Sequence, residues 1–341
     1  MTDDYLWDPS GPPDPEIQRL ERALGRLRTT APKPDFSAIG SAGDRLRTTR
    51  YVGSRFLWPA LAAAATMTFM IGVAWQSTRS TASWQVARLS GTPRIGLRGV
   101  SDASRLAIGE TLATDALSTA RVEVSTIGEV TIGENTRVRL VDARDAHYQL
   151  ALERGSLHAV ITAPPGQFVV NTPSATATDL GCVYTLRVEE DGSGLLSVAA
   201  GWVAFEEKGR ESFVPAGASS RTDPRNGPGT PSYDDADAAF QRALEIVDLE
   251  GADDRRRDAL RVVVDRARER DAMTLWHLIP RVSAAERSTV VDALAARVAM
   301  PGGVTREAVM RLDRDALDRW WDALGLLDTG WWRKWKMTIK N

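Results

Sequence analysis

The residues that could perform chemistry are few and scattered along the chain. There is one cysteine, Cys182, and there are three histidines, His147, His158 and His277. A nucleophile needs a base within hydrogen-bond reach, and a structural zinc site needs Cys and His at short spacings. His158 lies in an alternating strand pattern and His147 lies beside Tyr148, with no Ser or Cys in a recognisable catalytic setting. We therefore predict no catalytic residue, no metal site and no cofactor, and we expect that the protein is not an enzyme.

Binding chemistry is concentrated near the N-terminus. Four aliphatic residues between positions 17 and 27 recur at spacings of three, four and three, which places them on one face of a helix. Isolated helices of this length are marginal in water, so the apolar face requires a partner. The alternative is an arm that folds back on itself or lies on a membrane. The candidate partner-binding residues are Tyr5, Leu6, Trp7, Ile17, Leu20, Leu24 and Leu27.

The next element is a long uncharged run, Phe56–Trp75. At about 1.5 Å per residue, a helix of this length spans roughly 30 Å, the thickness of the hydrocarbon core of a bilayer. We predict one transmembrane helix, with a buried helix of a soluble core as the alternative. Four arginines precede it closely and two follow it, so the arm 1–55 is expected in the cytoplasm and the rest outside.

Short strands dominate residues 82–222. Apolar and polar residues alternate with a period near two, and Gly-containing turns recur between the runs. We predict an all-β domain, either a sandwich or a short β-roll, between which the sequence does not choose. The predicted strands include 121–124, 129–132, 137–140, 149–152, 157–161, 168–170, 183–188, 195–198 and 202–205.

The C-terminal part has a different composition. A Pro- and Gly-rich linker at 223–232 precedes residues 233–341, where helix formers predict a domain of α-helical hairpins. Its tail, Trp331–Met337, mixes aromatic and cationic residues. This mixture suits a membrane interface, stacking on glycans or single-stranded nucleic acid, or packing of the tryptophans in the helical core. The net charge of the chain is −2, which argues against direct nucleic-acid binding.

The order of several motifs resembles a known family. GETLATDALSTARVEV is followed by GEVTIGENTRVRL, by LALERGSLHAVI, and by a block from FVVNTPSATATDLGCVY to SVAAGWVAFE. Over about residues 86–220 the chain resembles the FecR domain of single-pass membrane regulators of extracytoplasmic-function sigma factors. Within the most specific block, Gly181 and Gly201 suit turns, and many family members have Thr in place of Cys182.

This resemblance implies a membrane-anchored, FecR-type signal transducer that acts like an anti-sigma factor in the regulation of transcription. It implies a location in the bacterial inner membrane, with the arm in the cytoplasm and the C-terminal body in the periplasm. The arm would bind a cytoplasmic sigma factor. The body would bind the signalling domain of an outer-membrane receptor or another envelope component. The alternative is an anchored envelope scaffold, or a protein- or glycan-binding module, without a transcriptional role.

Overall fold

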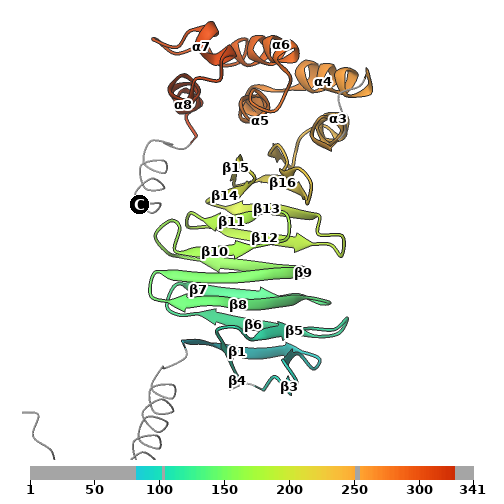
Figure 1. The fold of residues 1–341 in the computed structure, drawn as a ribbon, viewed down its shortest axis with the longest axis vertical. Helices are drawn as coiled ribbons and strands as arrows, with labels where there is room; N and C mark the ends of the chain where they lie inside the picture. Colours follow the sequence, from blue (N-terminus) through green and yellow to red (C-terminus); the bar gives the residue numbers. More distant parts are fainter. Residues whose placement is uncertain (1–81, 102–103, 250–253, 327–341) are drawn as a thin grey trace, which may run out of the picture. The chain divides into compact units, whose positions relative to one another are not determined.

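The computed structural model describes residues 82–326, apart from 102–103 and 250–253 (Figure 1). The predicted cytoplasmic arm, the predicted span Phe56–Trp75 and the Trp-rich tail lie outside these residues. The described part consists of a sheet followed by a group of helices.

Strands make up most of the chain up to residue 233. They are β1 (Ser83–Ser90), β2 (Arg94–Ile95), β3 (Arg98–Gly99), β4 (Ser104–Ala107), β5 (Thr111–Ala113), β6 (Thr119–Val124), β7 (Gly128–Ile132), β8 (Arg137–Arg144), β9 (His147–Ile161), β10 (Phe168–Asn171), β11 (Thr176–Asp179), β12 (Val183–Val188), β13 (Gly194–Ala200), β14 (Trp202–Glu207), β15 (Arg210–Pro215), β16 (Ala218–Asp223), β17 (Gly227–Pro228) and β18 (Ser232–Tyr233). All the strands predicted from alternation fall inside these elements.

The strands form two layers that share a core. Layer A contains β1, β4, β6, β7, β12, β13 and β16, with β17 and β18 paired to β16; layer B contains β2, β3, β5, β8, β10, β11, β14 and β15. In most strands, buried apolar residues alternate with more exposed ones, as a sheet with one covered face requires, whereas β14 and β15 carry runs of consecutive buried residues. Val122, Leu186 and Leu196 of layer A and Leu150 and Val170 of layer B have no exposed surface.

One strand, β9, belongs to both layers. Its first half pairs with β8 and β10, and its second half pairs with β7 and β12. Gly155 lies at the change, with φ of +90°, and a Cβ there would lie 2.4 Å from the Cα of Thr136. Glycine alone avoids both the strained dihedral and the clash. The sequence predicted separate strands on the two sides of this glycine, whereas the structure has one strand of 15 residues.

The predicted fold class, one transmembrane helix followed by a sandwich or short β-roll and a helical hairpin domain, is wrong. Among the described residues no helix is long and apolar enough to cross a membrane. The strands are joined into one large mixed sheet of 18 strands. Its parallel pair, β9 with β10, brings Tyr148 beside Phe168. Local alternation identifies a strand but carries no information about which strand it pairs with. The predicted domain of helical hairpins is confirmed in part, because helices α3 to α8 occupy the C-terminal part of the described chain.

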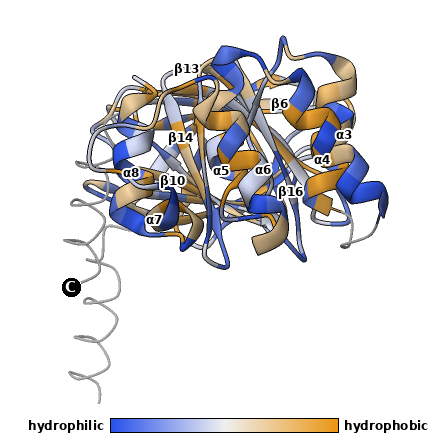
Figure 2. Cartoon of the chain, turned by 90° about the horizontal axis from the view of Figure 1, so that it is seen from above, coloured by the Kyte–Doolittle hydropathy of each residue, from blue (hydrophilic) through white to orange (hydrophobic). Residues whose placement is uncertain are grey.

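The helices follow the sheet. They are α3 (Ala238–Leu249), α4 (Asp254–Arg266), the 3₁₀ turn η2 (Glu269–Asp271), α5 (Ala272–Leu278), α6 (Ala284–Ala295), α7 (Arg306–Met310) and α8 (Arg314–Ala323). Ser283 caps α6 and exchanges hydrogen bonds with Glu286, and the two residues form a capping box. Helices α3, α4 and α8 carry apolar and polar residues on different sides, and all residues of α5 are buried (Figure 2). The helices lie at the C-terminal end of the strand stack (Figure 1). They cover this end of the sheet, which would otherwise expose unpaired strand edges.

Aromatic side chains join the helices to the sheet. Trp321 of α8 is fully buried, and its ring centroid lies 5.5 Å from Phe213 of β15 and 6.2 Å from Trp202 of β14. His277 of α5 accepts a 3.0 Å hydrogen bond at Nε2 from the backbone N–H of Phe213. Its Nδ1 lies 2.9 Å from the carbonyl oxygen of Met273, which fixes the neutral tautomer with the proton on Nδ1.

The predicted linker, 223–232, is part of this joint. It contains β17 and the start of β18, both paired to β16. Gly227, Pro228 and Thr230 within it are buried. Thr274 of α5 donates a 2.8 Å hydrogen bond to the carbonyl oxygen of Pro231. The sheet and the helices are therefore held together by the very segment that connects them.

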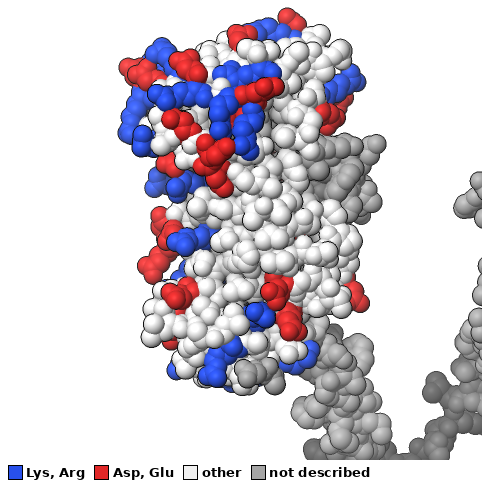
Figure 3. Space-filling view, turned by 180° about the vertical axis from the view of Figure 1, so that it is seen from behind, with Lys and Arg blue, Asp and Glu red and all other residues white. Residues whose placement is uncertain are grey.

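The charges on the described surface are of both signs. Viewed from behind, Lys, Arg, Asp and Glu are interspersed over the helices and recur near the first strands, while the middle of this face carries few charges (Figure 3). A continuous basic patch, which nucleic-acid binding requires, is not seen on this face.

Candidate binding groove between the sheet and helix α3

Layer A places one polar residue from each of six strands in a row across its outer face. The register pairs Thr131 with His158, His158 with Thr185, and Thr185 with Ser197. Ser197 pairs with Ser219, and Ser219 pairs with Ser232. Neighbouring strands are about 4.8 Å apart, so the row repeats at that spacing. We call Thr131, His158, Thr185, Ser197, Ser219 and Ser232 the polar row; each of them is half-buried or exposed.

The hydrogen bonds within the polar row leave acceptors free. Ser219 donates to Oδ1 of Asp234 at 2.6 Å, and a 2.8 Å hydrogen bond joins Ser197 to Ser219. A hydroxyl has a single proton, so Ser197 must donate to Ser219 and keeps its own oxygen as an acceptor. His158 and Thr185 are joined at 3.1 Å between Nδ1 and Oγ1. The row thus contains two separate hydrogen-bonded groups, His158 with Thr185 and Ser197 with Ser219, and it offers both donors and acceptors.

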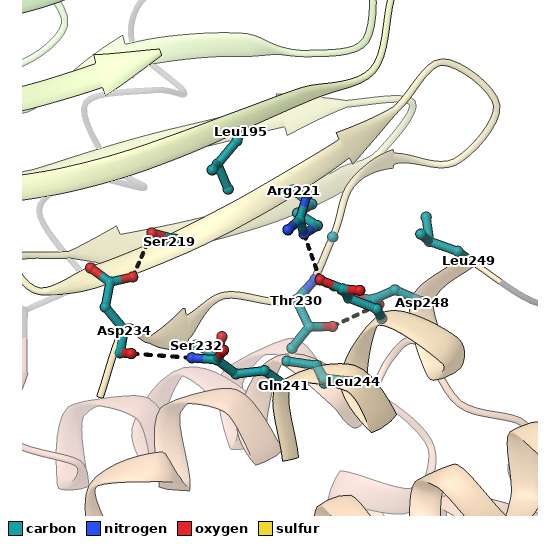
Figure 4. Close-up of a pocket in the computed structure, with 12 residues that line it drawn as sticks. Leu195, Ser219, Arg221, Thr230, Ser232, Asp234, Gln241, Leu244, Asp248 and Leu249 are labelled. Atoms are coloured by element: carbon teal, nitrogen blue, oxygen red, sulfur yellow. Dashed lines mark hydrogen bonds and ion pairs between the residues drawn. The ribbon is translucent and has the colours of Figure 1, made fainter. Parts of the chain in front are cut away.

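Helix α3 covers one end of the polar row and encloses a cavity of about 260 Å³ (Figure 4). Ser219 and Arg221 of β16 lie on one side, and Gln241 of α3 lies on the other. Gln241 donates to the carbonyl oxygen of Asp234 at 3.2 Å, which holds its side chain across the cavity. Exposed apolar surface comes from Leu195 and Leu249, while Leu244 is nearly buried. The other lining residues are Gly229, Thr230, Ser232, Asp234, Glu245 and Asp248.

A second hollow of about 430 Å³ continues the first across β12 and β13. Both hollows are lined by Leu195 and Arg221. Arg221 makes a 2.6 Å ion pair with Glu245 of α3. Arg187 and Glu189 also line the second hollow, and neither makes an ion pair within the described residues. We call the two hollows together the α3 groove. Its lining contains two arginines and four carboxylates, and its walls are rich in hydroxyl groups.

A buried polar network supports the floor of the α3 groove. Asp248 accepts hydrogen bonds from the backbone N–H of Thr230 at 2.5 Å and from its hydroxyl at 2.8 Å, and it pairs with Arg210 at 3.2 Å. Arg281, which follows α5, donates to the Thr230 hydroxyl at 2.9 Å and to Ser212 at 2.7 Å. Burial of its guanidinium lowers the pKa of Arg281 to about 10, so it stays protonated near neutral pH. These charged hydrogen bonds fix α3 and α5 against the sheet.

The single cysteine lies elsewhere, in a buried turn of the FecR-like block. Cys182 donates from Sγ to Oδ2 of Asp179 at 2.7 Å, and the backbone N–H of Gly181 donates to Oδ1 at 2.6 Å. Burial and the neighbouring carboxylate raise the pKa of the Cys182 thiol far above its ordinary value. The thiolate is the reactive form of cysteine, so this geometry stabilises the turn instead of activating a nucleophile.

Burial also raises the pKa of Asp179, from an ordinary 3.8 to about 6. The folded protein therefore holds this proton more tightly than the unfolded chain does. Between about pH 4 and pH 6 stability is expected to fall as pH rises, by at most about 1.4 kcal/mol per pH unit from this group. Asp179→Asn should remove this component of the slope. The measurement is urea unfolding across this pH range; an unchanged slope in the variant would contradict the assignment.

The residues predicted from sequence to bind a partner, Tyr5, Leu6, Trp7, Ile17, Leu20, Leu24 and Leu27, lie outside the described residues. Within the described ranges, no cluster of His, Cys, Asp and Glu could hold a metal ion. The α3 groove was not predicted. Its signal in the sequence was the outward Ser and Thr at alternate positions of β12, β13 and β16, but that pattern is typical of any half-exposed strand.

Comparison with known proteins finds a family match within the sheet. Residues 110–204 match the FecR protein family. The FecR match begins just before β5 and ends within β14, so it includes the Asp179–Cys182 turn and four members of the polar row. It confirms the resemblance seen in the motifs. The rest of the α3 groove, on β16 and α3, lies beyond the matched residues.

The similarity to solved structures is weak. Two crystal structures, at 1.65 and 2.50 Å resolution, of a candidate anti-sigma factor from Parabacteroides distasonis each share 17% identity with this chain and have a TM-score of 0.33. The similarity covers 39% of this chain and 63% and 62% of those chains, so it spans less than two thirds of their length. No curated protein matches the chain in sequence.

Proposed function

We propose that this protein is a FecR-type regulator that acts by binding and not by catalysis. The observation that carries the proposal is the FecR match over residues 110–204. The described body would bind a signal or partner, and the arm 1–55 would contact a cytoplasmic sigma factor and act on it as an anti-sigma factor does. The body would be exported, and its partner would be a receptor signalling domain or another envelope component.

The packing of the body supports a role in transmitting a binding event. Arg281 and His277 fix the helices to β15, and Asp248 fixes α3 to the segment after β17. A ligand in a groove bounded by both parts would contact them together. A ligand shifts the equilibrium between two conformations of a protein only if it binds one of them more tightly. The contacts between the ligand and the body must therefore differ between the two states of the arm.

Contact with a sigma factor can be tested through the arm. In the full chain, Leu20→Asp with Leu24→Asp should abolish co-purification of a sigma factor, because two charges would interrupt the predicted apolar face. Arg19→Asp with Arg22→Asp adds the same side chains off that face and should retain the sigma factor. The measurement is affinity purification from the native host, with bound proteins identified by mass spectrometry.

If only Arg19→Asp with Arg22→Asp abolished co-purification, the prediction that the apolar face binds the sigma factor would be contradicted. The regulator proposal fails if the unmodified chain co-purifies with no sigma factor and deletion of the arm 1–55 leaves transcription unchanged. The protein would then be assigned to the alternative, a scaffold without a transcriptional role. The cellular location stays a prediction from the sequence. An alkaline phosphatase fused after residue 341 should be active if the body is exported.

A further inference from the structure

We propose that the α3 groove and the polar row bind a linear, uncharged glycan chain. This inference names a ligand class for the body and does not depend on contact between the arm and a sigma factor. It rests on the geometry of the row, on the balance of donors and acceptors, and on the pairing of the strands beneath.

The geometry of the row suits a repeating polymer. Six strands present one polar side chain each, from Thr131 to Ser232, at a repeat of about 4.8 Å. This repeat is close to the length of one pyranose ring along an extended glycan. The row runs into the cavity beneath α3, where Leu195 and Leu249 offer an apolar surface for the C–H face of a sugar (Figure 4).

The chemistry of the groove matches hydroxyl groups. Sugar hydroxyls donate and accept, so their site must do both. Ser197 keeps an acceptor because its proton goes to Ser219, and the hydroxyls of Thr131 and Ser232 have no partner within the described residues. Arg221 is paired with Glu245, and Arg187 lies in the same hollow as Glu189. The lining contains two arginines and four carboxylates, and ion pairs engage two of these carboxylates, Glu245 and Asp248. The groove therefore disfavours an anionic polymer.

The pairing of the strands argues against an extended peptide. A peptide that adds to a sheet binds through free backbone groups at an exposed strand edge. Here β12 pairs with β9 and β13, and β13 pairs with β12 and β16. β16 pairs in turn with β17 and β18. Strands β12, β13 and β16 therefore offer no open backbone edge, and among the described strands that line the groove only the two-residue strand β18 is paired on one side alone. Most of the floor can recognise a ligand only through side chains.

The test is calorimetric titration of the full 341-residue chain with cellohexaose, chitohexaose and laminarihexaose, and with an unstructured peptide of alternating Ser and Gly. At least one of the sugars should bind with one site per chain, and the peptide should not. Binding of none of the sugars would overturn the proposal. Binding of the peptide in place of the sugars would assign the groove to a polypeptide instead. The titration contains no sigma factor, so failure here leaves the regulator proposal intact.

Matched variants locate the site. Thr185→Val with Ser197→Ala removes two hydroxyls from the row and should weaken sugar binding by about thirtyfold, the effect of losing two neutral hydrogen bonds. Thr176→Val with Thr178→Val makes similar changes on the half-buried outer side of β11 in layer B and should leave binding unchanged. Thermal unfolding of both variants confirms that they fold. Equal affinity in both pairs, or a loss confined to the β11 pair, would overturn the assignment of the site.

Discussion

Asp248→Ala is expected to lower the free energy of unfolding by about 3–5 kcal/mol, the usual cost of removing one partner from a buried charge network. The Asp248 side chain is 9% exposed and accepts hydrogen bonds from the backbone and hydroxyl of Thr230. Its loss leaves Arg210 without its carboxylate and places Arg281 close to an uncompensated positive charge. The measurement is equilibrium unfolding in urea followed by circular dichroism.

Glu245→Ala provides a matched control one turn earlier on α3. Glu245 also pairs with an arginine, Arg221, but both side chains are about half exposed. Exposed pairs contribute roughly 0–1 kcal/mol, because water already solvates the separated charges. Similar losses for the two variants would mean that the network beneath the α3 groove does not hold the helix in place.

Trp321→Ala is expected to cost about 3–5 kcal/mol, as large-to-small changes of buried aromatic residues do. The ring has no exposed surface and lies against Trp276 at 4.8 Å and His277 at 5.3 Å, as well as against Phe213. Removing it opens a cavity between the helices and β15. The measurement is thermal unfolding together with near-ultraviolet circular dichroism, which reports the packing of these aromatic rings.

Trp202→Ala is the comparison for Trp321. Trp202 meets the same cluster from β14 but is half-buried, and its centroid is 6.2 Å from that of Trp321. Its truncation should cost less, because part of the ring already contacts water. If Trp202→Ala were the more damaging change, the main joint between sheet and helices would lie outside the cluster centred on Trp321.

The sequence placed the elements well, because their signals are local. Val122 and Val124 alternate with polar residues, and both are buried in β6. Ser283 and Glu286 form a capping box, and α6 begins there. These patterns depend on residues only a few positions apart, so they can be read without knowledge of the rest of the chain.

The candidate site was not predictable in the same way. Thr185, Ser197 and Ser219 become neighbours through strand register, and Arg281 reaches Ser212 across 69 positions. Nothing in the local pattern around any of them differs from that of an ordinary solvated strand or helix end. The tertiary arrangement therefore had to be known before the α3 groove could be recognised.

By itself, the sequence determined the positions of many strands and helices and the resemblance to FecR over about residues 86–220, since both follow from the order of side chains along the chain. The tertiary structure decided that β9 passes through both layers, that β10 pairs parallel to it, and that the segment 223–232 holds the helices against the sheet. The physical reason is that these features depend on contacts between residues far apart in the chain. Such contacts form only when the chain folds, because apolar faces then pack together and buried polar groups form hydrogen bonds.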